Sequence, residues 1–441
     1  MELASVHAAA RGGQDAPAAA GDALERLVLG ALCLWFAAQV AALGLSLAGY
    51  SSQGFLYKKL LLLDFGGADS WGAMEAAWRW LADGRDAPVY DAVFFDQKIK
   101  FQYPLTSLLI YPLAAALGVE NTVQAFNAIG WICVVVQGAA AGAIADALLQ
   151  RRPGGTDLRV RGLCLAAAAL VTVTFYPVVR GFGLGQVQTW ITTLFLLASL
   201  CWLKGRMGGA GLLIGCACLF KPQLGLFLLW AALRRNRAFA TGFLAATIPA
   251  GLASLVLFGL GNNLGYLDVL AQISRQGEVF VANQSVNGLA HRLLTSADSR
   301  VWTSESFAPY SPAVHAVTVV SCVGLMLFGL LFRRRSQPQG WTAFLVAALA
   351  FTLASPVAWE HHFGFVAIVF VALLADAADR PRRGLRLAVI GLAYALTSHD
   401  LFAIAIAHLP VNSILASFFF FAMIAVLVLL STSDRPSSRI A

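Results

Sequence analysis

Apolar residues are grouped along the chain into long runs that are separated by short basic clusters. An α-helix needs about 20 apolar residues to cross a bilayer, and the runs reach or approach this length. They cover residues 25–49, 121–149, 162–180, 187–203, 238–258, 313–332, 341–355, 361–375 and 412–430. This pattern predicts an all-α polytopic membrane protein.

Lysine and arginine between these runs indicate which side of the membrane each loop faces. The clusters and the chain ends hold 20 of the 31 basic residues. They are Arg11, Arg26, Arg151, Arg152, Arg159, Arg161, Lys204, Arg206, Arg234, Arg235, Arg237, Arg333, Arg334, Arg335, Arg380, Arg382, Arg383, Arg386, Arg435 and Arg439. Because cytoplasmic loops are enriched in Lys and Arg, we expect about twelve passes with both ends inside.

Two apolar segments have to bend for this sidedness to hold. Run 207–233 lies between two basic clusters, so it enters the membrane and returns, turning at Lys221-Pro222 because proline cannot continue a helix. Each limb is shorter than the hydrocarbon core, so the turn lies below the outer surface and beside a cavity. Segment 104–118 is predicted to be re-entrant, and a full pass is the alternative. A full pass would invert residues 150–206 against the charge rule.

These predictions give one transmembrane domain over residues 24–430, with cytoplasmic tails at 1–23 and 431–441. Two outer loops are large, 50–120 and 259–312. The composition agrees, since 59% of residues are hydrophobic and 12% are charged, with a mean hydropathy of +0.72. Soluble domains have about 25% charged residues. The net charge of +8 is attributed to cytoplasmic loops, and we expect no nucleic-acid partner. The seven cysteines lie in apolar runs without a CxxC, which argues against disulfides and metal.

The first outer loop contains an amphipathic segment at residues 70–83. Trp71, Met74 and Trp78 fall at helical spacing on one face, and Gly84 follows as a stop signal. The segment therefore predicts a helix lying in the outer interface. Asp69 precedes it, either as a cap on the helix dipole or as a general base that faces an extracytoplasmic substrate.

Several short motifs occur in one order and on one predicted membrane face. Together they resemble glycosyltransferase family 87 over about residues 64–375, although Leu105 stands where a second proline is common. The motifs are Asp69-x14-Gly84-x5-Tyr90-Asp91, Phe101-x-Tyr103-Pro104-Leu105-Thr106, Pro112-Leu113, Gly185-Gln186, Gly211-x3-Gly215, Lys221-Pro222-Gln223, Asn283-Gln284-Ser285-x2-Gly288-x3-Arg292 and Ser355-Pro356-x2-Trp359-x-His361-His362.

The resemblance implies a GT-C-type fold and transfer of a sugar from a polyprenyl-phosphate carrier to an acceptor on the extracytoplasmic side. The best-known members use polyprenyl-phosphate mannose and act on lipid-anchored glycans. In this fold a carboxylate at the start of the first outer loop is the catalytic base. That residue is Asp69 by its match to the motif, with Asp64 as second choice.

Phosphate contacts are expected from basic side chains on the outer side. Lys221 is recessed in the membrane, where an ionisable residue is a functional candidate, although a snorkelling structural lysine is the alternative. Arg292 can bind a phosphate with two N–H groups or form a surface salt bridge. His361 and His362 follow Glu360 near the start of a helix and can donate to phosphate or sugar, or pack at the interface. Adjacent side chains on a helix diverge and no HExxH is present, so we predict no metal.

The remaining motif residues are candidate sugar or acceptor ligands. Gln186 would either hydrogen-bond a sugar hydroxyl or cap the helix that follows it. The others are Tyr103, Asn283, Gln284 and Trp359.

We therefore predict an inverting, cofactor-free and metal-independent glycosyltransferase of a bacterial inner membrane, with its active site facing the exterior. It would move a hexose, with mannose as first choice, to a lipid-linked or cell-envelope glycan. The alternatives are a flippase or transporter of lipid-linked glycans and a polymerase or ligase that uses lipid diphosphates. The sequence contains no P-loop, GxSxG or dinucleotide-binding motif, so we do not expect the enzyme to use nucleotide sugars or ATP.

Overall fold

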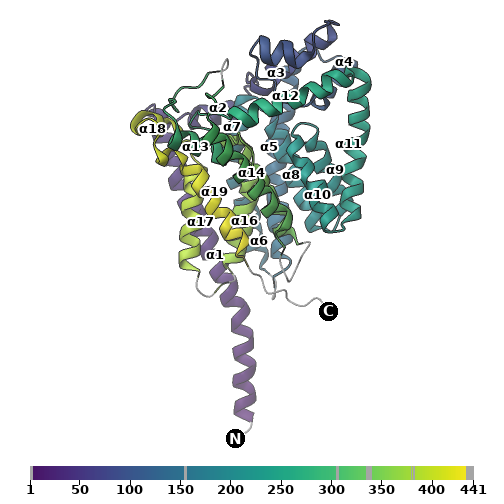
Figure 1. The fold of residues 1–441 in the computed structure, drawn as a ribbon. Helices are drawn as coiled ribbons and strands as arrows, with labels where there is room; N and C mark the ends of the chain where they lie inside the picture. The colour runs from purple at the N-terminus through teal and green to yellow at the C-terminus, as the bar shows by residue number, and fades with distance from the viewer. Residues whose placement is uncertain are drawn as a thin grey trace.

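The computed structural model describes the backbone of residues 3–152, 156–303, 307–333, 340–378, 380 and 383–433, and side chains from residue 24 onward. These residues form helices and connecting loops, apart from one isolated β-bridge between Asn283 and Trp359. Figure 1 shows the helices gathered into one bundle, from which the first part of α1 projects. The predicted all-α fold is therefore confirmed.

Long apolar helices form the frame of the bundle. Within the described part of the chain, five segments are long and apolar enough to cross a membrane. They belong to α1 (Leu3–Leu47), α5 (Thr122–Leu149), α11 (Arg237–Phe258), α14 (Pro312–Leu331) and η5 (Ile414–Ser417) with α19 (Phe418–Ser431).

Shorter helices fill the frame, and two pairs of them are bent. The angle is 44° between α6 (Leu158–Val173) and α7 (Tyr176–Leu184), and 76° between α17 (Gly384–Thr397) and α18 (Phe402–His408). If each bent pair is counted as one span, the number of candidate membrane spans among the described residues rises from five to seven. The twelve passes therefore stay a prediction. The other short apolar helices are α8 (Gln188–Leu203), α9 (Met207–Cys218), α10 (Leu226–Leu233), α15 (Trp341–Leu353) and α16 (Val366–Ala378).

The two predicted outer loops are largely helical. The first contains α2 (Gln53–Leu61), α3 (Asp69–Ala82), the π-helix η1 (Tyr90–Asp96), the 3₁₀-helix η2 (Leu105–Leu109) and α4 (Ile110–Ala116). The second contains α12 (Leu260–Gln276) and α13 (Val286–Leu294). Figure 1 places α3, α4, α12 and α13 at the end of the bundle opposite the start of α1.

Helix α3 confirms the amphipathic segment predicted at residues 70–83. Trp71 and Met74 are buried, and Gly84 ends the helix with a φ of +63°. The adjoining segment 104–118 forms η2 and α4, which together span 12 residues, or about 18 Å at ~1.5 Å per residue. That length cannot cross a hydrocarbon core of ~30 Å, so the full-pass alternative is wrong.

Arginines after helix ends bind free carbonyl groups of neighbouring helices. Arg234 follows α10 and donates to Leu330 O of α14 at 2.8 Å, whereas Arg333 follows α14 and donates to Leu233 O of α10 at 2.7 Å. The last carbonyls of a helix lack intrahelical partners, and its C-terminus carries partial negative charge. These basic clusters therefore stabilise helix ends in addition to marking one side of the protein.

Run 207–233 turns back on itself, as its composition predicts. It consists of α9, the 3₁₀-helix η3 (Pro222–Gly225) and α10, with Lys221 in an extended conformation before the proline. Gly211 and Gly215 of α9 meet Phe239 and Phe243 in the first turns of α11. The two helices therefore run in the same direction, and α10 returns to the end from which α9 started.

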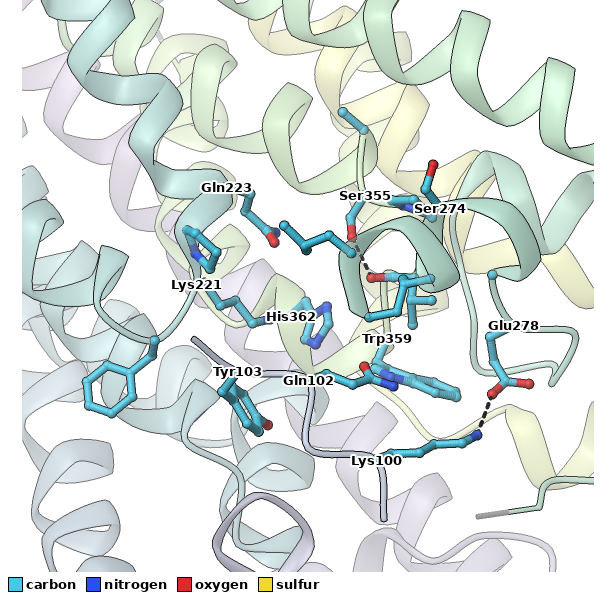
Figure 2. Close-up of a pocket in the computed structure, with 18 of the residues that line it drawn as sticks. Lys100, Gln102, Tyr103, Lys221, Gln223, Ser274, Glu278, Ser355, Trp359 and His362 are labelled. Atoms are coloured by element: carbon cyan, nitrogen blue, oxygen red, sulfur yellow. Dashed lines mark hydrogen bonds and ion pairs between the residues drawn. The ribbon is translucent and has the colours of Figure 1, made fainter. Parts of the chain in front are cut away.

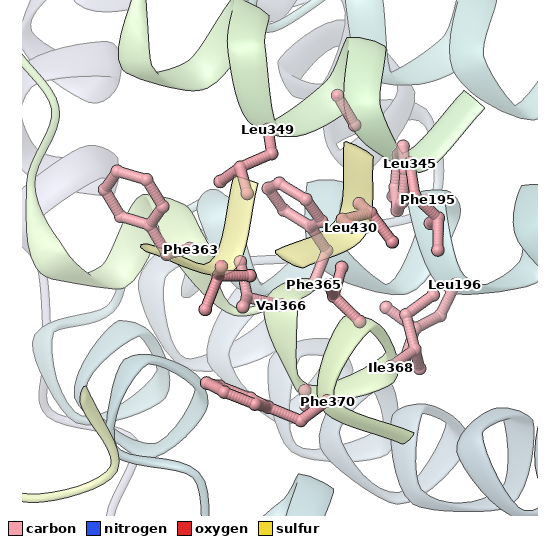
Figure 3. Packing of buried hydrophobic residues seen from close by; sticks show 14 of the residues in the cluster. Phe195, Leu196, Leu345, Leu349, Phe363, Phe365, Val366, Ile368, Phe370 and Leu430 are labelled. Atoms are coloured by element: carbon pink, nitrogen blue, oxygen red, sulfur yellow. The ribbon is translucent and has the colours of Figure 1, made fainter. Parts of the chain in front are cut away.

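The centre of the bundle is α15, in which 11 of 13 residues are buried. A helix that is apolar on every side belongs in the core. Phe344 of α15 contacts the rings of Phe195 and Trp202, with centroids 5.0 and 5.1 Å apart. Figure 3 shows Leu349 of this helix near Phe363 and Phe365, which follow it in the chain, and Leu345 near Phe195. The segment between α15 and α16 is thus held by the core at both ends.

Candidate active site

A cavity of about 1580 Å³ lies between helices of the two large loops and neighbouring helices of the bundle. Its walls come from α3, the segment before η2, α7, the turn between α9 and α10, α12, α14 and the segment after α15. Seven of the predicted site residues line it, and Figure 2 shows four of them, Tyr103, Lys221, Trp359 and His362. The seven are Asp69, Tyr103, Gln186, Lys221, Trp359, His361 and His362.

Asp69 is the first residue of α3 and faces this cavity. A close backbone contact fixes its position, because a Cβ on Gly185 would lie 2.1 Å from the carbonyl oxygen of Gly67. Gly185 also ends α7 in the left-handed region, with a φ of +71°, which glycine adopts without strain. The glycine of the Gly185-Gln186 motif therefore allows the loop before Asp69 to lie against α7.

Gln186 orients the carboxylate. Its amide nitrogen donates to Asp69 Oδ2, and its amide oxygen accepts from Ser70 Oγ at 2.6 Å. Helix α8 begins two residues later, and Gln186 does not cap it, so that interpretation of the sequence is wrong. The hydroxyl group of Tyr103 completes the cluster at 2.7 Å from Ser70 Oγ.

The surroundings of Asp69 raise the pKa of its carboxyl group above the usual value of 3.8. The cause is removal from bulk water by the cavity walls, which disfavours the charged form. The hydrogen bond from Gln186 and the positive charges of Arg180 and Lys100 act in the opposite direction, in that order. A carboxyl group with a raised pKa is suited to taking up a proton during a reaction.

Lys221 enters the cavity from the turn between α9 and α10. No carboxylate of the described residues pairs with it, and it makes no hydrogen bond to them. Figure 2 shows its side chain extending toward His362. Thr106 supports the turn, because its hydroxyl donates to Leu219 O at 2.7 Å and satisfies a carbonyl at the helix break. A recessed cation without a counter-ion indicates a place for an anion.

His361 and His362 belong to the 3₁₀-helix η4 (Glu360–Phe363), and their rings meet edge to face with centroids 4.8 Å apart. Both nitrogens of His361 and Nδ1 of His362 are buried and have no hydrogen-bond partner. Buried polar atoms without partners are rare in proteins and mark places where an additional group belongs. Trp359 stands before them, with its ring centroid 6.2 Å from that of Phe280.

Asn283, Gln284 and Arg292 do not line the cavity. Asn283 and Gln284 have no exposed surface and Arg292 has 3%. Asn283 accepts from Ala358 N at 3.0 Å and donates to Pro356 O at 3.1 Å.

These buried side chains hold the segment that carries the histidines. Gln284 donates to Ala416 O at 2.9 Å, and Arg292 donates to Ser417 Oγ at 2.9 Å and to Asn283 O at 3.1 Å. The motif at 283–292 therefore joins the loop after α15 to the start of α19. In this structure its polar groups hydrogen-bond within the scaffold and do not line the cavity.

Asp64 also lies outside the cavity wall. Its side chain is 49% exposed, it accepts from Gly66 N at 3.0 Å, and Lys59 is 4.0 Å away. It therefore shapes the loop that leads to Asp69.

Five further charged residues of the cavity wall were not predicted, namely Lys98, Lys100, Arg180, Glu278 and Glu360. Arg180 Nε lies 3.2 Å from Glu360 Oε1, and Lys100 Nζ lies 3.2 Å from Glu278 Oε2. Figure 2 shows the second pair at the far side of the cavity from Lys221. A charged residue in an apolar segment is the signal that could have identified Arg180, which the sequence places between apolar residues of α7.

Metal ligation has no obvious location here. Among the residues that the structure describes, no group of three His, Cys, Asp or Glu side chains has metal-binding geometry. The seven cysteines are all free.

Comparisons with known proteins found one matching family model and several similar proteins. The sequence model of glycosyltransferase family 87 matches residues 101–356, which is more than half of the chain. Two similar proteins carry the name polyprenol-phosphate-mannose-dependent alpha-(1-2)-phosphatidylinositol mannoside mannosyltransferase. The one from Mycobacterium tuberculosis is 26% identical over 326 residues, which cover 71% of each chain. The one from Mycolicibacterium smegmatis is 25% identical over 300 residues, 66% of each chain.

A third relative, from Mycobacterium tuberculosis, is a polyprenol-phosphate-mannose-dependent alpha-(1-2)-phosphatidylinositol pentamannoside mannosyltransferase. It is 27% identical over 304 residues, which cover 68% of this chain and 64% of the relative. No solved structure matches this chain significantly.

Proposed function

The chain belongs to glycosyltransferase family 87, and on that premise we propose that it transfers mannose from polyprenyl-phosphate mannose to a lipid-linked glycan acceptor. The observation that carries the proposal is the presence of Asp69, Lys221 and His362 on the wall of one cavity. The names of the relatives support the donor and indicate a glycolipid as the class of acceptor. The family favours the enzyme over the flippase that the sequence left open.

Asp69 is the general base of this reaction. Its carboxylate takes the proton of the acceptor hydroxyl while the hydroxyl oxygen forms a bond to the anomeric carbon. Gln186 and Ser70 keep it in place, so little reorganisation is needed in the transition state. A positioned base contributes about 10²–10⁴-fold to such a reaction. Attack opposite the leaving phosphate inverts the anomeric centre.

Lys221 and His362 stabilise the leaving group. The bond from the anomeric carbon to the phosphate oxygen breaks, and its electron pair stays on that oxygen. The phosphate thereby changes from a singly charged diester to a monoester with a second negative charge. An uncompensated lysine in a largely apolar wall interacts more strongly with this developing charge than with the substrate. No metal ion or cofactor is needed in this scheme.

The apolar side of the cavity suits the isoprenoid chain of the donor. Side chains of α10, α12 and α14 form it, and α14 is one of the helices long and apolar enough to cross a membrane. They are Leu226, Leu229, Leu270, Val319, Val323 and Met326. A lipid that occupies this side places its phosphate next to Lys221.

The cavity would face the exterior of a bacterial inner membrane. Figure 1 places the helices of the two large loops at the end opposite the start of α1, and the charge pattern assigns that end to the outside. A polyprenyl-phosphate sugar that has been moved across the membrane is then within reach.

The test is transfer of labelled mannose from polyprenyl-phosphate mannose in membranes that contain the protein. Asp69→Asn keeps the shape of the side chain but removes the base, and we expect transfer to fall by at least 10²-fold. Asp83→Asn is the matched control, because Asp83 follows the same helix and pairs with Arg85 at the surface. Full transfer by Asp69→Asn would refute the assignment of the base. Absence of transfer by the unaltered enzyme with this donor would refute the proposed function.

A further inference from the structure

Arg180 combines a fixed position with an open side toward the cavity. Its Nε lies 3.2 Å from Glu360 Oε1, and the side chain of Glu360 is 3% exposed, whereas that of Arg180 is 30% exposed. Both residues line the cavity. The carboxylate thus lies behind the guanidinium group, and the guanidinium group forms the surface that a ligand meets.

The ion pair leaves most of the donors of Arg180 unused. Its two terminal amino groups make no hydrogen bond to any residue that the structure describes, and they are not among the buried atoms that lack a partner. They are therefore open to the cavity. The two terminal amino groups of a planar guanidinium can each donate an N–H to a different oxygen of a phosphate.

The surrounding charges place Arg180 in the reacting part of the cavity. Its positive charge acts on Asp69 and on His361, and the charge of Lys221 also acts on His361. On the protein side, the charge of Asp400 acts on Arg180, and Asp400 is itself held by Ser52 through N at 2.8 Å and Oγ at 2.6 Å. Acidic groups therefore anchor the guanidinium group from behind and leave its front free.

We propose that Arg180 binds the phosphate of the lipid donor with its two terminal amino groups, and that Glu360 is the positioning residue that holds it. This inference rests on the proposed function and adds a second cation to Lys221. It also supplies the guanidinium contact that the sequence suggested for Arg292, whose side chain is buried in the scaffold. Because the phosphate gains a negative charge as the sugar leaves, Arg180 stabilises the transition state more than the bound donor.

The experiment measures inhibition by a short product mimic, farnesyl phosphate, and by farnesol, which has the same chain without the phosphate. Arg180→Gln should weaken inhibition by farnesyl phosphate about 10- to 100-fold, the range expected for hydrogen bonds to a charged group. Inhibition by farnesol should not change, and kcat should fall. Arg180→Lys should give an intermediate loss, because a point charge remains without the fork.

Variants of Glu360 separate positioning from charge. In Glu360→Gln an amide oxygen can still accept from Arg180 Nε, so inhibition by farnesyl phosphate should stay near that of the unaltered enzyme. In Glu360→Ala the anchor is absent, and inhibition should weaken about tenfold with no further loss when Arg180→Gln is added. Arg79→Gln is the control, since Arg79 is 72% exposed and pairs with Glu75 on α3.

Two results would overturn the inference, and neither depends on the activity of the protein. If Arg180→Gln and Arg180→Lys both bind farnesyl phosphate as tightly as the unaltered protein does, Arg180 does not bind phosphate. Equal effects of Glu360→Gln and Glu360→Ala would show that Glu360 acts by charge and not by position. Direct binding of farnesyl phosphate, followed as a shift of the thermal midpoint, gives the same comparison if the enzyme proves inactive with polyprenyl-phosphate mannose.

Discussion

At the scale of single residues, the cavity wall contains a carboxylate that can accept a proton, Asp69, and several basic side chains that can bind an anion. Gln186 donates a hydrogen bond to Asp69, and Ser70 and Tyr103 extend this hydrogen-bond chain behind Gln186. Lys221 lines the same cavity without a counter-ion among the described residues. Leaving these two charges unpaired costs folding free energy, which is typical of sites that meet a substrate carrying the missing charges.

Gln186 should control the pH dependence of transfer. The carboxylate of Asp69 has to be deprotonated to act as a base, so activity is lost as the pH falls through its raised pKa. The Gln186 amide stabilises the charged form, so Gln186→Leu raises the pKa of Asp69 further and moves the acidic limb of kcat to higher pH. At neutral pH we expect kcat to fall about ten- to hundredfold, the range for a hydrogen bond to a charged group.

The control for this prediction is Gln150→Leu. Gln150 also donates to an aspartate, Asp146, at 2.8 Å, but at the C-terminal end of α5, and neither residue lines the cavity. Its removal should leave the pH profile as it is. An unchanged acidic limb in Gln186→Leu would contradict the idea that this amide sets the protonation of Asp69.

Lys221 should reduce the stability of the substrate-free protein. Removing an uncompensated charge from an apolar wall relieves its desolvation penalty, so Lys221→Met should increase the free energy of unfolding by about 1 kcal/mol. Transfer should fall at least 10²-fold, because the leaving phosphate loses its cation. Thermal unfolding in detergent and the transfer assay measure the two effects.

Lys59→Met provides the comparison for Lys221. Lys59 is also a lysine with a largely buried side chain, but it has partners: it donates to Gly183 O at 3.3 Å and lies 4.0 Å from Asp64. Its replacement should not stabilise the protein. A lower thermal midpoint for Lys221→Met would show that Lys221 has a structural partner, and would remove the argument for an anion beside it.

At the scale of elements, the motifs of the sequence place the turns that carry the site. Glycines of α9 allow α11 to approach so closely that a Cβ on Gly211 would lie 2.0 Å from Phe239 O. Helices in membranes associate through such small residues because backbones gain packing contacts there. The depth of Lys221 therefore depends on how α9 lies against α11.

Gly211→Ala tests this dependence. The added methyl group has to displace backbone, so we expect a loss of about 1–3 kcal/mol in the free energy of unfolding and a large loss of transfer. Gly208→Ala is the matched control, because a Cβ there would be 3.6 Å from Ala238 O, an ordinary contact distance. Thermal midpoints of the two variants in the same detergent decide the matter. Equal midpoints would show that close packing at Gly211 is not required.

The sequence indicated the elements more completely than it indicated the roles of their polar residues. Helical spacing, proline and charge were sufficient to predict α3 and the break at Lys221, whereas the gathering of Asp69, Lys221 and His362 was expected from the motifs shared with the family. Asn283, Gln284 and Arg292 were expected to bind substrate, but they hydrogen-bond to carbonyl and hydroxyl groups of the loop after α15 and of residues 416–417. Polar residues in a motif look the same whether their partner is a substrate or a distant backbone group, and only tertiary contacts separate the two cases.

At the scale of the whole molecule, charge and shape define two ends. The end opposite the cavity holds arginines that bind the terminal carbonyls of neighbouring helices, as Arg234 and Arg333 do for α14 and α10. The other end holds helices of the two large loops (Figure 1), and residues of both loops line the cavity. A donor that reaches the protein from the bilayer can keep its chain among the helices while its sugar lies under the loops.

Sidedness can be tested with two exposed arginines, one from each end. In a chain whose seven native cysteines are replaced by alanine or serine, Arg85→Cys lies in the first large loop and Arg235→Cys lies between α10 and α11. Both positions are exposed on the protein, so a difference in labelling reports the side of the membrane on which each one lies. We expect a membrane-impermeant maleimide to label Arg85→Cys in intact cells, and Arg235→Cys only after permeabilisation, because basic loops remain in the cytoplasm. The opposite labelling would place the cavity in the cytoplasm, where a lipid-linked sugar that has been moved to the exterior could not reach Asp69.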